Sequence, residues 1–113
     1  MIDVEQVRRM ALSLPEATER EAWGTPAFRV KDKIFARMLE DGRSLAIKAP
    51  EDERWLLSES EPDTYSVPPH YRNYSMMVVR LSRIDPDSLK AHLIQAWRLT
   101  APKRLVAAYH AEG

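Results

Sequence analysis

The chain has 113 residues, with 17 Lys and Arg against 17 Asp and Glu, so its formal net charge is zero. Zero Cys excludes disulfide scaffolds, thiolate metal sites and cysteine nucleophiles, and no apolar run approaches the ~18 residues that span a bilayer. The length predicts a single domain over residues 1–113. Because the N-terminal stretch carries acids and lacks the apolar segment of a signal peptide, we expect a cytoplasmic protein with no membrane partner.

The first predicted element is a helix that begins after Asp3 and stops at Pro15. Asp3 is a favourable N-cap, and Gln6 stands at the third helical position, as in a capping box. Apolar residues then recur at three- and four-residue spacing and predict one buried stripe: Val4, Val7, Met10, Ala11 and Leu14.

The middle of the chain changes to a period of two. This pattern predicts strands over residues 27–30, 34–39 and 44–48, although the apolar run over 34–39 also fits a helix, and a weak edge strand over 19–23. The Asp41-Gly42 dipeptide indicates a hairpin turn.

A short helix is predicted from Pro50 to about residue 59. Proline suits the first helical position, and the three acids that follow suit the first turn. Trp55, Leu56 and Leu57 are its predicted buried side. The prolines that follow predict an irregular connection over residues 61–73.

The last third predicts one strand and two helices. The strand covers residues 75–81 and points Met77 and Val79 to one face, leaving Arg80 on the other. Asp85 and Pro86 begin a helix whose predicted buried stripe is Leu89, Leu93, Ala96, Trp97 and Thr100; a final helix runs from about Pro102 to residue 110. Helices at both ends of a hairpin-rich middle predict an α+β domain, an antiparallel β-sheet with helices packed mainly on one face.

Four blocks occur in the order found in one protein family: WGTPAFRV at 23–30 with KIFA at 33–36, LAIK at 45–48 with Pro50, PPHY at 68–71 leading to VVRL at 78–81, and AWRLTAPKRL at 96–105. Together they resemble the MmcQ/YjbR proteins over about residues 14–108. The resemblance implies a CyaY-like, double-wing fold, in which β-hairpins flank a helical layer, and a DNA-binding function. Many members have Trp or Gly-Trp just before the late strand, where this chain has Tyr74.

The zero net charge is the sum of two unequal halves. Residues 1–63 hold 10 cations and 14 acids, whereas residues 64–113 hold 7 cations and 3 acids. Gathered on one face, the C-terminal cations would contact phosphates, and we select five of them as candidates: Arg72, Arg80, Arg83, Lys103 and Arg104. The alternative is that these side chains are ordinary solvated charges, since a neutral domain is not typical of nucleic-acid binders.

Aromatic residues supply the remaining candidates. Tyr71 and Tyr74 are interleaved with a cation and suit stacking on bases, although they equally suit covering the end of a core. His70 lies in the same loop, and Trp23 precedes a Gly-Thr-Pro turn, so both are candidates for lining a groove. Trp55 and Trp97 are expected in the core.

An enzyme is not predicted. The chain has no H-E-x-x-H motif, glycine-rich phosphate loop or nucleophile elbow, so we expect no catalytic residues, cofactor or metal. The leading hypothesis is a non-enzymatic DNA-binding module, with DNA as the partner. The alternative is a protein- or small-ligand-binding domain, a homodimer included, that uses a groove beside Trp23 and the tyrosine loop. A continuous positive face would favour the first, and an apolar cleft in a mixed surface the second.

Overall fold

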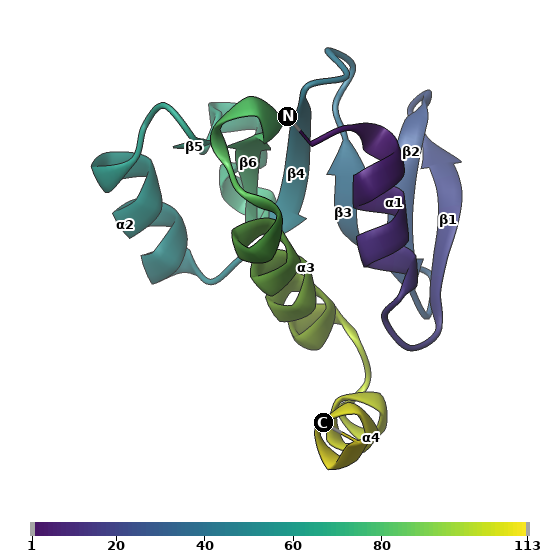
Figure 1. The fold of residues 1–113 in the computed structure, drawn as a ribbon. Coiled ribbons are helices and arrows are strands. Elements are labelled where there is room, and N and C mark those ends of the chain that lie inside the picture. Colours follow the sequence, from purple (N-terminus) through teal and green to yellow (C-terminus); the bar gives the residue numbers. More distant parts are fainter. Residues whose placement is uncertain (1, 113) are drawn as a thin grey trace.

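A computed structural model describes residues 2–112, with the side chains of residues 72, 73 and 110–112 left out of the description. Helices and strands follow one another along the chain in this order (Figure 1): α1 (Val4–Leu12), β1 (Ala17–Ala22), β2 (Thr25–Val30), β3 (Lys33–Met38), β4 (Ser44–Lys48), α2 (Glu51–Ser60), β5 (Tyr65–Ser66), the 3₁₀ helix η1 (Pro69–Tyr74), β6 (Met76–Arg80), the 3₁₀ helix η2 (Leu81–Arg83), α3 (Pro86–Thr100) and α4 (Lys103–Glu112). Over the described residues, every helix is too short or too polar to cross a membrane.

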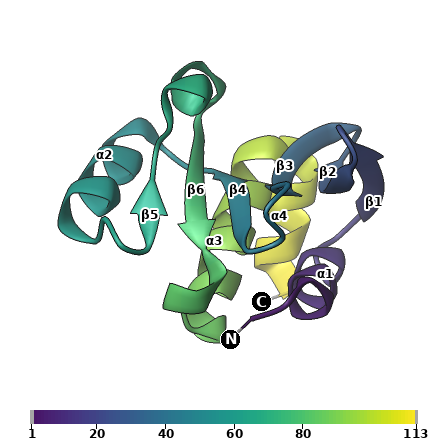
Figure 2. The same ribbon diagram turned by 90° about the horizontal axis from the view of Figure 1, so that it is seen from above.

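The strands form one six-stranded antiparallel sheet in the order β1-β2-β3-β4-β6-β5. Helices α1 and α3 pack on one face, η1 lies on the opposite side of the sheet, and α2 lies beyond the β5 edge (Figure 2). The predicted α+β class, with an antiparallel sheet covered by helices mainly on one face, is therefore confirmed. We call the face opposite α1 and α3 the open face.

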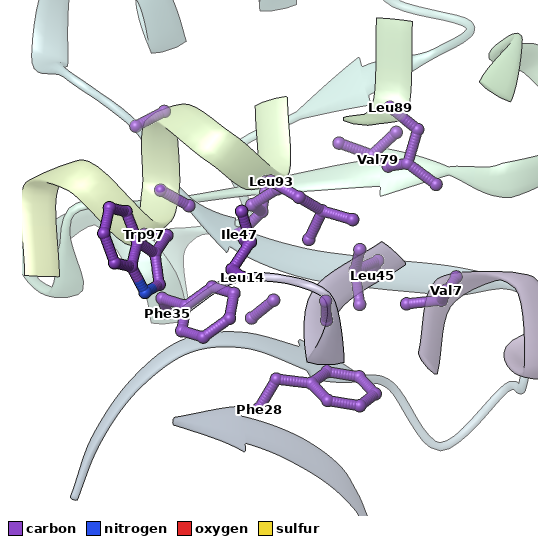
Figure 3. Close-up of a cluster of buried hydrophobic side chains, with 14 of the residues drawn as sticks. Val7, Leu14, Phe28, Phe35, Leu45, Ile47, Val79, Leu89, Leu93 and Trp97 are labelled. Atoms are coloured by element: carbon purple, nitrogen blue, oxygen red, sulfur yellow. The ribbon is translucent and has the colours of Figure 1, made fainter. Parts of the chain in front are cut away.

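The core lies between the sheet and these two helices (Figure 3). The predicted capping box of α1 is present, since Asp3 Oδ1 accepts from the Gln6 backbone N–H at 2.9 Å and Gln6 Oε1 accepts from Asp3 N–H at 3.1 Å. Helix α3 buries four of the five side chains predicted for it, Leu89, Leu93, Ala96 and Trp97, whereas Thr100 in its last turn is only half-buried. The Trp97 indole N–H donates to the Pro15 carbonyl at 3.0 Å, so the one polar atom of this buried ring is satisfied.

A β-bulge between β2 and β3 decides which side chains reach the open face. Phe28 lies opposite Ala36, but Arg29 lies opposite Ile34, so Phe35 is the extra residue. In such a bulge two successive residues oppose one residue of the partner strand. Phe35 and Ala36 are consequently both fully buried in the core, while Arg29 and Ile34 line the open face. The alternation predicted for this strand does not include the bulge.

Several details of the short-helix prediction were wrong. Pro50 is the N-cap of α2 rather than its first residue. Trp55 and Leu56 are 66% and 57% exposed, and only Leu57 of the three packs against the core. The reason is position: α2 adjoins the edge strand β5 rather than lying across the sheet, so only one narrow side of it meets protein.

Candidate binding cleft

A cleft of about 1140 Å³ lies on the open face and extends at the end of the sheet to Leu99 and Thr100 of α3. Its walls come from the β1–β2 turn, β3, the start of α2, η1 and the end of α3. The volume slightly exceeds the roughly 300–1,000 Å³ of a small-ligand pocket. Its cationic and aromatic lining residues are Trp23, Arg29, Lys33, Arg37, Lys48, Arg54, His70, Tyr71 and Tyr74.

Arg37 is the central residue of the cleft. It lies opposite Ala27 on β2 and Ala46 on β4, and these small neighbours leave room for its guanidinium on the open face. The residue is only 8% exposed. Its Nη1 donates to Thr25 Oγ1 at 2.7 Å and to Glu40 Oε1 at 3.3 Å, and its Nη2 donates to the Tyr71 hydroxyl at 3.1 Å. One side chain thus links two hairpin turns to η1.

Trp23 sits at the rim of the cleft in a strained turn. Trp23 and Gly24 are the two central residues of the β1–β2 hairpin, with φ of +51° and +82°. A type I′ turn needs positive φ at both positions, which glycine adopts freely and a bulky residue does not. Trp23 is nevertheless 79% exposed, and the Arg37 guanidinium lies 5.3 Å from its ring centroid. Strain that exposes a large aromatic ring is typical of functional positions.

The opposite wall is the aromatic 3₁₀ helix η1. The His70 ring lies 5.0 Å from that of Tyr71 and 5.9 Å from that of Tyr74, centroid to centroid. Tyr74 is 57% exposed, and its carbonyl accepts from Lys48 Nζ at 3.0 Å. Trp23, Arg37, Tyr71, His70 and Tyr74 therefore form a continuous chain of contacts between the two walls.

Four cations of the cleft have no ion pair among the described residues: Arg29, Lys33, Lys48 and Arg54. Arg29 donates one long hydrogen bond, 3.4 Å, to the Asp32 carbonyl. The Nε atoms of Arg29 and Arg54 are buried with no hydrogen-bond partner. An N–H donor buried without a partner costs about 1–3 kcal/mol, so the protein does not fully satisfy these two guanidinium groups.

The acids that line the cleft are distributed along it: Asp32 follows β2, Glu40 pairs with Arg37, and Glu51 begins α2. Glu51 is followed by Asp52 and Glu53 in the first turn of α2. These three carboxylates already offset the positive end of the helix dipole, which disfavours a phosphate there. Arg29 and Lys33, on β2 and β3, have only Asp32 near them in the chain. The part of the cleft beside Arg29 and Lys33 is therefore a better position for an anion than the start of α2.

The structure separates the residues selected from sequence into two groups. Trp23, His70, Tyr71 and Tyr74 all line the cleft. The exposed Arg80 and Arg83 lie at and beyond the far end of β6, and Lys103 and Arg104 are exposed at the start of α4. The Lys31 ammonium holds the carboxyl pKa of Glu16, just after α1, below its ordinary value, and Arg104 adds a smaller lowering. The Arg72 side chain lies outside the described parts.

The cations that do meet the aromatics come from residues 29–54, within the half of the chain with excess acid. Comparing the net charges of the two halves of the chain did not identify these cations. The reason is that the sheet places β3 and β4, from the first half, beside η1, from the second half. One available signal was the alternation in β2, where Arg29 lies between the core residues Phe28 and Val30.

A second polar cluster lies outside the cleft and joins α2, β5 and α3. His92 Nε2 is 2.9 Å from the Tyr65 hydroxyl, and His92 Nδ1 is 3.6 Å from Glu53 Oε1. Gln95 donates to Glu53 Oε2 at 2.7 Å. Burial lowers the pKa of His92 and raises the pKa of Tyr65, so Tyr65 is not an activated nucleophile. Within the described residues, no three His, Asp or Glu side chains group as metal ligands.

This cluster predicts a pH-dependent stability. Because burial outweighs the charges of Glu53 and Glu61, the folded pKa of His92 lies below its ordinary value of 6.5. The unfolded chain then binds a proton first, so the free energy of unfolding should fall as pH drops below about 6.5 and level off below the folded pKa. Urea unfolding between pH 5 and 8 measures this, and His92→Gln should lose the dependence. An unchanged slope in the variant would assign it to other groups.

Comparison with known proteins identifies the domain. The YjbR family model matches residues 12–99, which include every cationic and aromatic residue of the cleft. Uncharacterized protein Rv2570 of Mycobacterium tuberculosis and uncharacterized protein Mb2600 of Mycobacterium bovis are each 36% identical to the chain over 59 residues. That match covers 52% of this chain and 46% of each relative, so it spans about half the length of those proteins.

A solved structure has the same fold. The crystal structure of Deinococcus radiodurans protein DR2400, whose family-model domain is DUF419, superposes with a TM-score of 0.76 at 20% identity. The superposition covers 88% of this chain and 78% of that one. The likeness extends over nearly the whole sheet-and-helix arrangement of Figure 1.

Proposed function

The chain belongs to the YjbR family, and we propose that it is a non-enzymatic domain that binds DNA through the cleft on the open face of its sheet. The observation that carries the proposal is the meeting of exposed aromatics with unpaired cations around one buried arginine. Cations without protein partners suit phosphates, and exposed rings suit bases. We assign Arg29, Lys33 and Arg54 to contacts with phosphates, and Trp23 and Tyr74 to stacking on bases.

A small planar anion is the second candidate, since the cleft also has apolar lining: Ile34, Ala49, Met76 and Leu99. Leu99 is the most exposed of the four, at 54%. The cleft therefore combines the two signatures that were expected to distinguish the hypotheses, and binding experiments must separate them.

The proposal is tested by salt-dependent DNA binding with two charge-matched double variants. Removing Arg29 and Lys33 (both to Ala) should weaken binding at least tenfold and reduce the slope of log K against log salt by about 1.4–1.8, since each lost phosphate contact accounts for about 0.7–0.9. Removing Lys103 and Arg104 changes the net charge equally but lies outside the cleft lining. Fluorescence anisotropy of a labelled 20-nucleotide DNA between 50 and 200 mM salt measures both variants.

The control should bind within about twofold of the original chain, because the two charges lie on α4. No binding at ~50 mM salt would contradict the proposal. Equal losses in the two double variants would also contradict it, because attraction by net charge alone would then explain the binding. A small anion that binds while DNA does not would favour the second candidate.

A further inference from the structure

We propose that the cleft binds a single strand, with an unpaired base on Trp23 and the phosphates of the same strand at Arg29 and Lys33. This inference rests on the proposed DNA-binding function and specifies the form of the DNA. Its starting point is that the two kinds of ligand-binding residue occupy different ends of the cleft.

Trp23 offers a stacking surface with one free face. The guanidinium of Arg37 lies over the ring at 5.3 Å, and the side chain is 79% exposed. Arg37 is itself held by Thr25, Glu40 and Tyr71, so the ring rests on a fixed support rather than on a loose side chain. Such a support leaves little motion to be lost when a base stacks on the ring.

An unpaired base fits this surface better than a paired one. In a duplex each base is stacked between its neighbours, so its faces are unavailable to a protein ring unless the stack is opened at a cost. A single strand presents free base faces, and stacking one of them on an aromatic side chain strengthens binding by about 5-fold to 150-fold. Tyr74, 57% exposed on the opposite wall, is placed for a second base.

The separation of the two ends sets the length of strand required. Thr25, next to the Trp23–Gly24 turn, and Arg29 are four residues apart on β2, which is about 13 Å at the usual rise along a strand. At roughly 3.4 Å per stacked nucleotide, and a longer advance per unstacked one, that distance corresponds to at most about four nucleotides. A free mononucleotide therefore reaches one end only, whereas a strand of four or more reaches both.

The test compares DNA forms at fixed salt. Labelled single strands of 2, 4, 8 and 12 nucleotides and a 12-base-pair duplex are titrated by anisotropy, with dAMP as an unlabelled competitor. We expect the 12-nucleotide strand to bind at least tenfold tighter than the duplex, a steep gain in affinity between 2 and 4 nucleotides, and weak competition by dAMP. Trp23→Ala should weaken single-strand binding about tenfold, and Trp23→Phe should restore most of it.

Trp55→Ala is the matched control, because Trp55 is also exposed but lies outside the cleft lining. Tighter duplex binding that depends on Arg29 and Lys33 would overturn this inference and leave the proposed function in place. No binding to either DNA form would overturn both. Competition by dAMP equal to that of the 12-nucleotide strand would overturn the inference in favour of a small planar anion. Circular dichroism confirms that each variant is folded before its affinity is compared.

Discussion

Replacing Arg37 by leucine should weaken DNA binding at least tenfold and lower the free energy of unfolding by about 2–3 kcal/mol. The variant removes the hydrogen bonds to Thr25, Glu40 and Tyr71. Each hydrogen bond to a charged group contributes about 1.5–3 kcal/mol, but Glu40 is mostly exposed and its share is screened by solvent. Trp23 would at the same time lose the guanidinium that lies over its ring.

Arg37→Lys is the informative control for this change. Lysine keeps the positive charge but lacks the planar fork that reaches Thr25 and Tyr71 in two directions. We expect the lysine variant to lose most of the affinity gained by Trp23 and to keep part of the phosphate attraction. Anisotropy titrations and urea unfolding of both variants measure these effects. Full affinity in folded Arg37→Leu would show that the cleft does not depend on its central residue.

Trp97→Ala should have the largest effect on stability, about 3–5 kcal/mol. The ring is fully buried in the core of Figure 3, its indole N–H donates to Pro15, and its other neighbours include Tyr109 at 5.3 Å between centroids. Removing it leaves a cavity under α3 and an unsatisfied carbonyl. Since domains of this size unfold at a cost of about 5–15 kcal/mol, the loss is a large fraction of the total.

Trp55→Ala removes the same atoms from an exposed position on α2, where Trp55 is 66% exposed. Substitutions on such surfaces change stability by about 0.5 kcal/mol or less. Differential scanning calorimetry should therefore show a melting temperature at least about 10 °C lower for Trp97→Ala and nearly unchanged for Trp55→Ala. Equal shifts in the two variants would contradict the assignment of α3 to the core.

Local signals predicted the ends and the buried sides of the elements where the helix or strand lies flat on the core. Asp3 and Asp85 cap α1 and α3, and the stripe of α3 faces the sheet. Helix α2 carries the same kind of apolar residues, yet Trp55 and Leu56 face outward because the helix lies at a sheet edge. Periodicity finds an apolar side but does not show whether a partner element covers it.

The site was harder to predict because the sheet brings together residues that lie far apart in the sequence. Trp23, His70, Tyr71 and Tyr74 were recognised from residue type and turn context, and they do line one cleft. Their cationic neighbours are residues 29–54, and the antiparallel pairing brings these beside η1. Charge summed along the sequence contains no information on that pairing. The acidic excess belongs mainly to residues 51–63, which hold six acids and one cation.

The most direct test of the cleft as the DNA site follows the indole N–H signals of the three tryptophans by ¹⁵N–¹H NMR during a single-strand titration. Trp23 is 79% exposed and lines the cleft, Trp55 is 66% exposed outside it, and Trp97 is buried. If the DNA site is the cleft, the Trp23 signal shifts and saturates with the binding curve while the Trp55 and Trp97 signals stay in place. A shift of Trp55 with an unmoved Trp23 would place the DNA elsewhere and contradict the account.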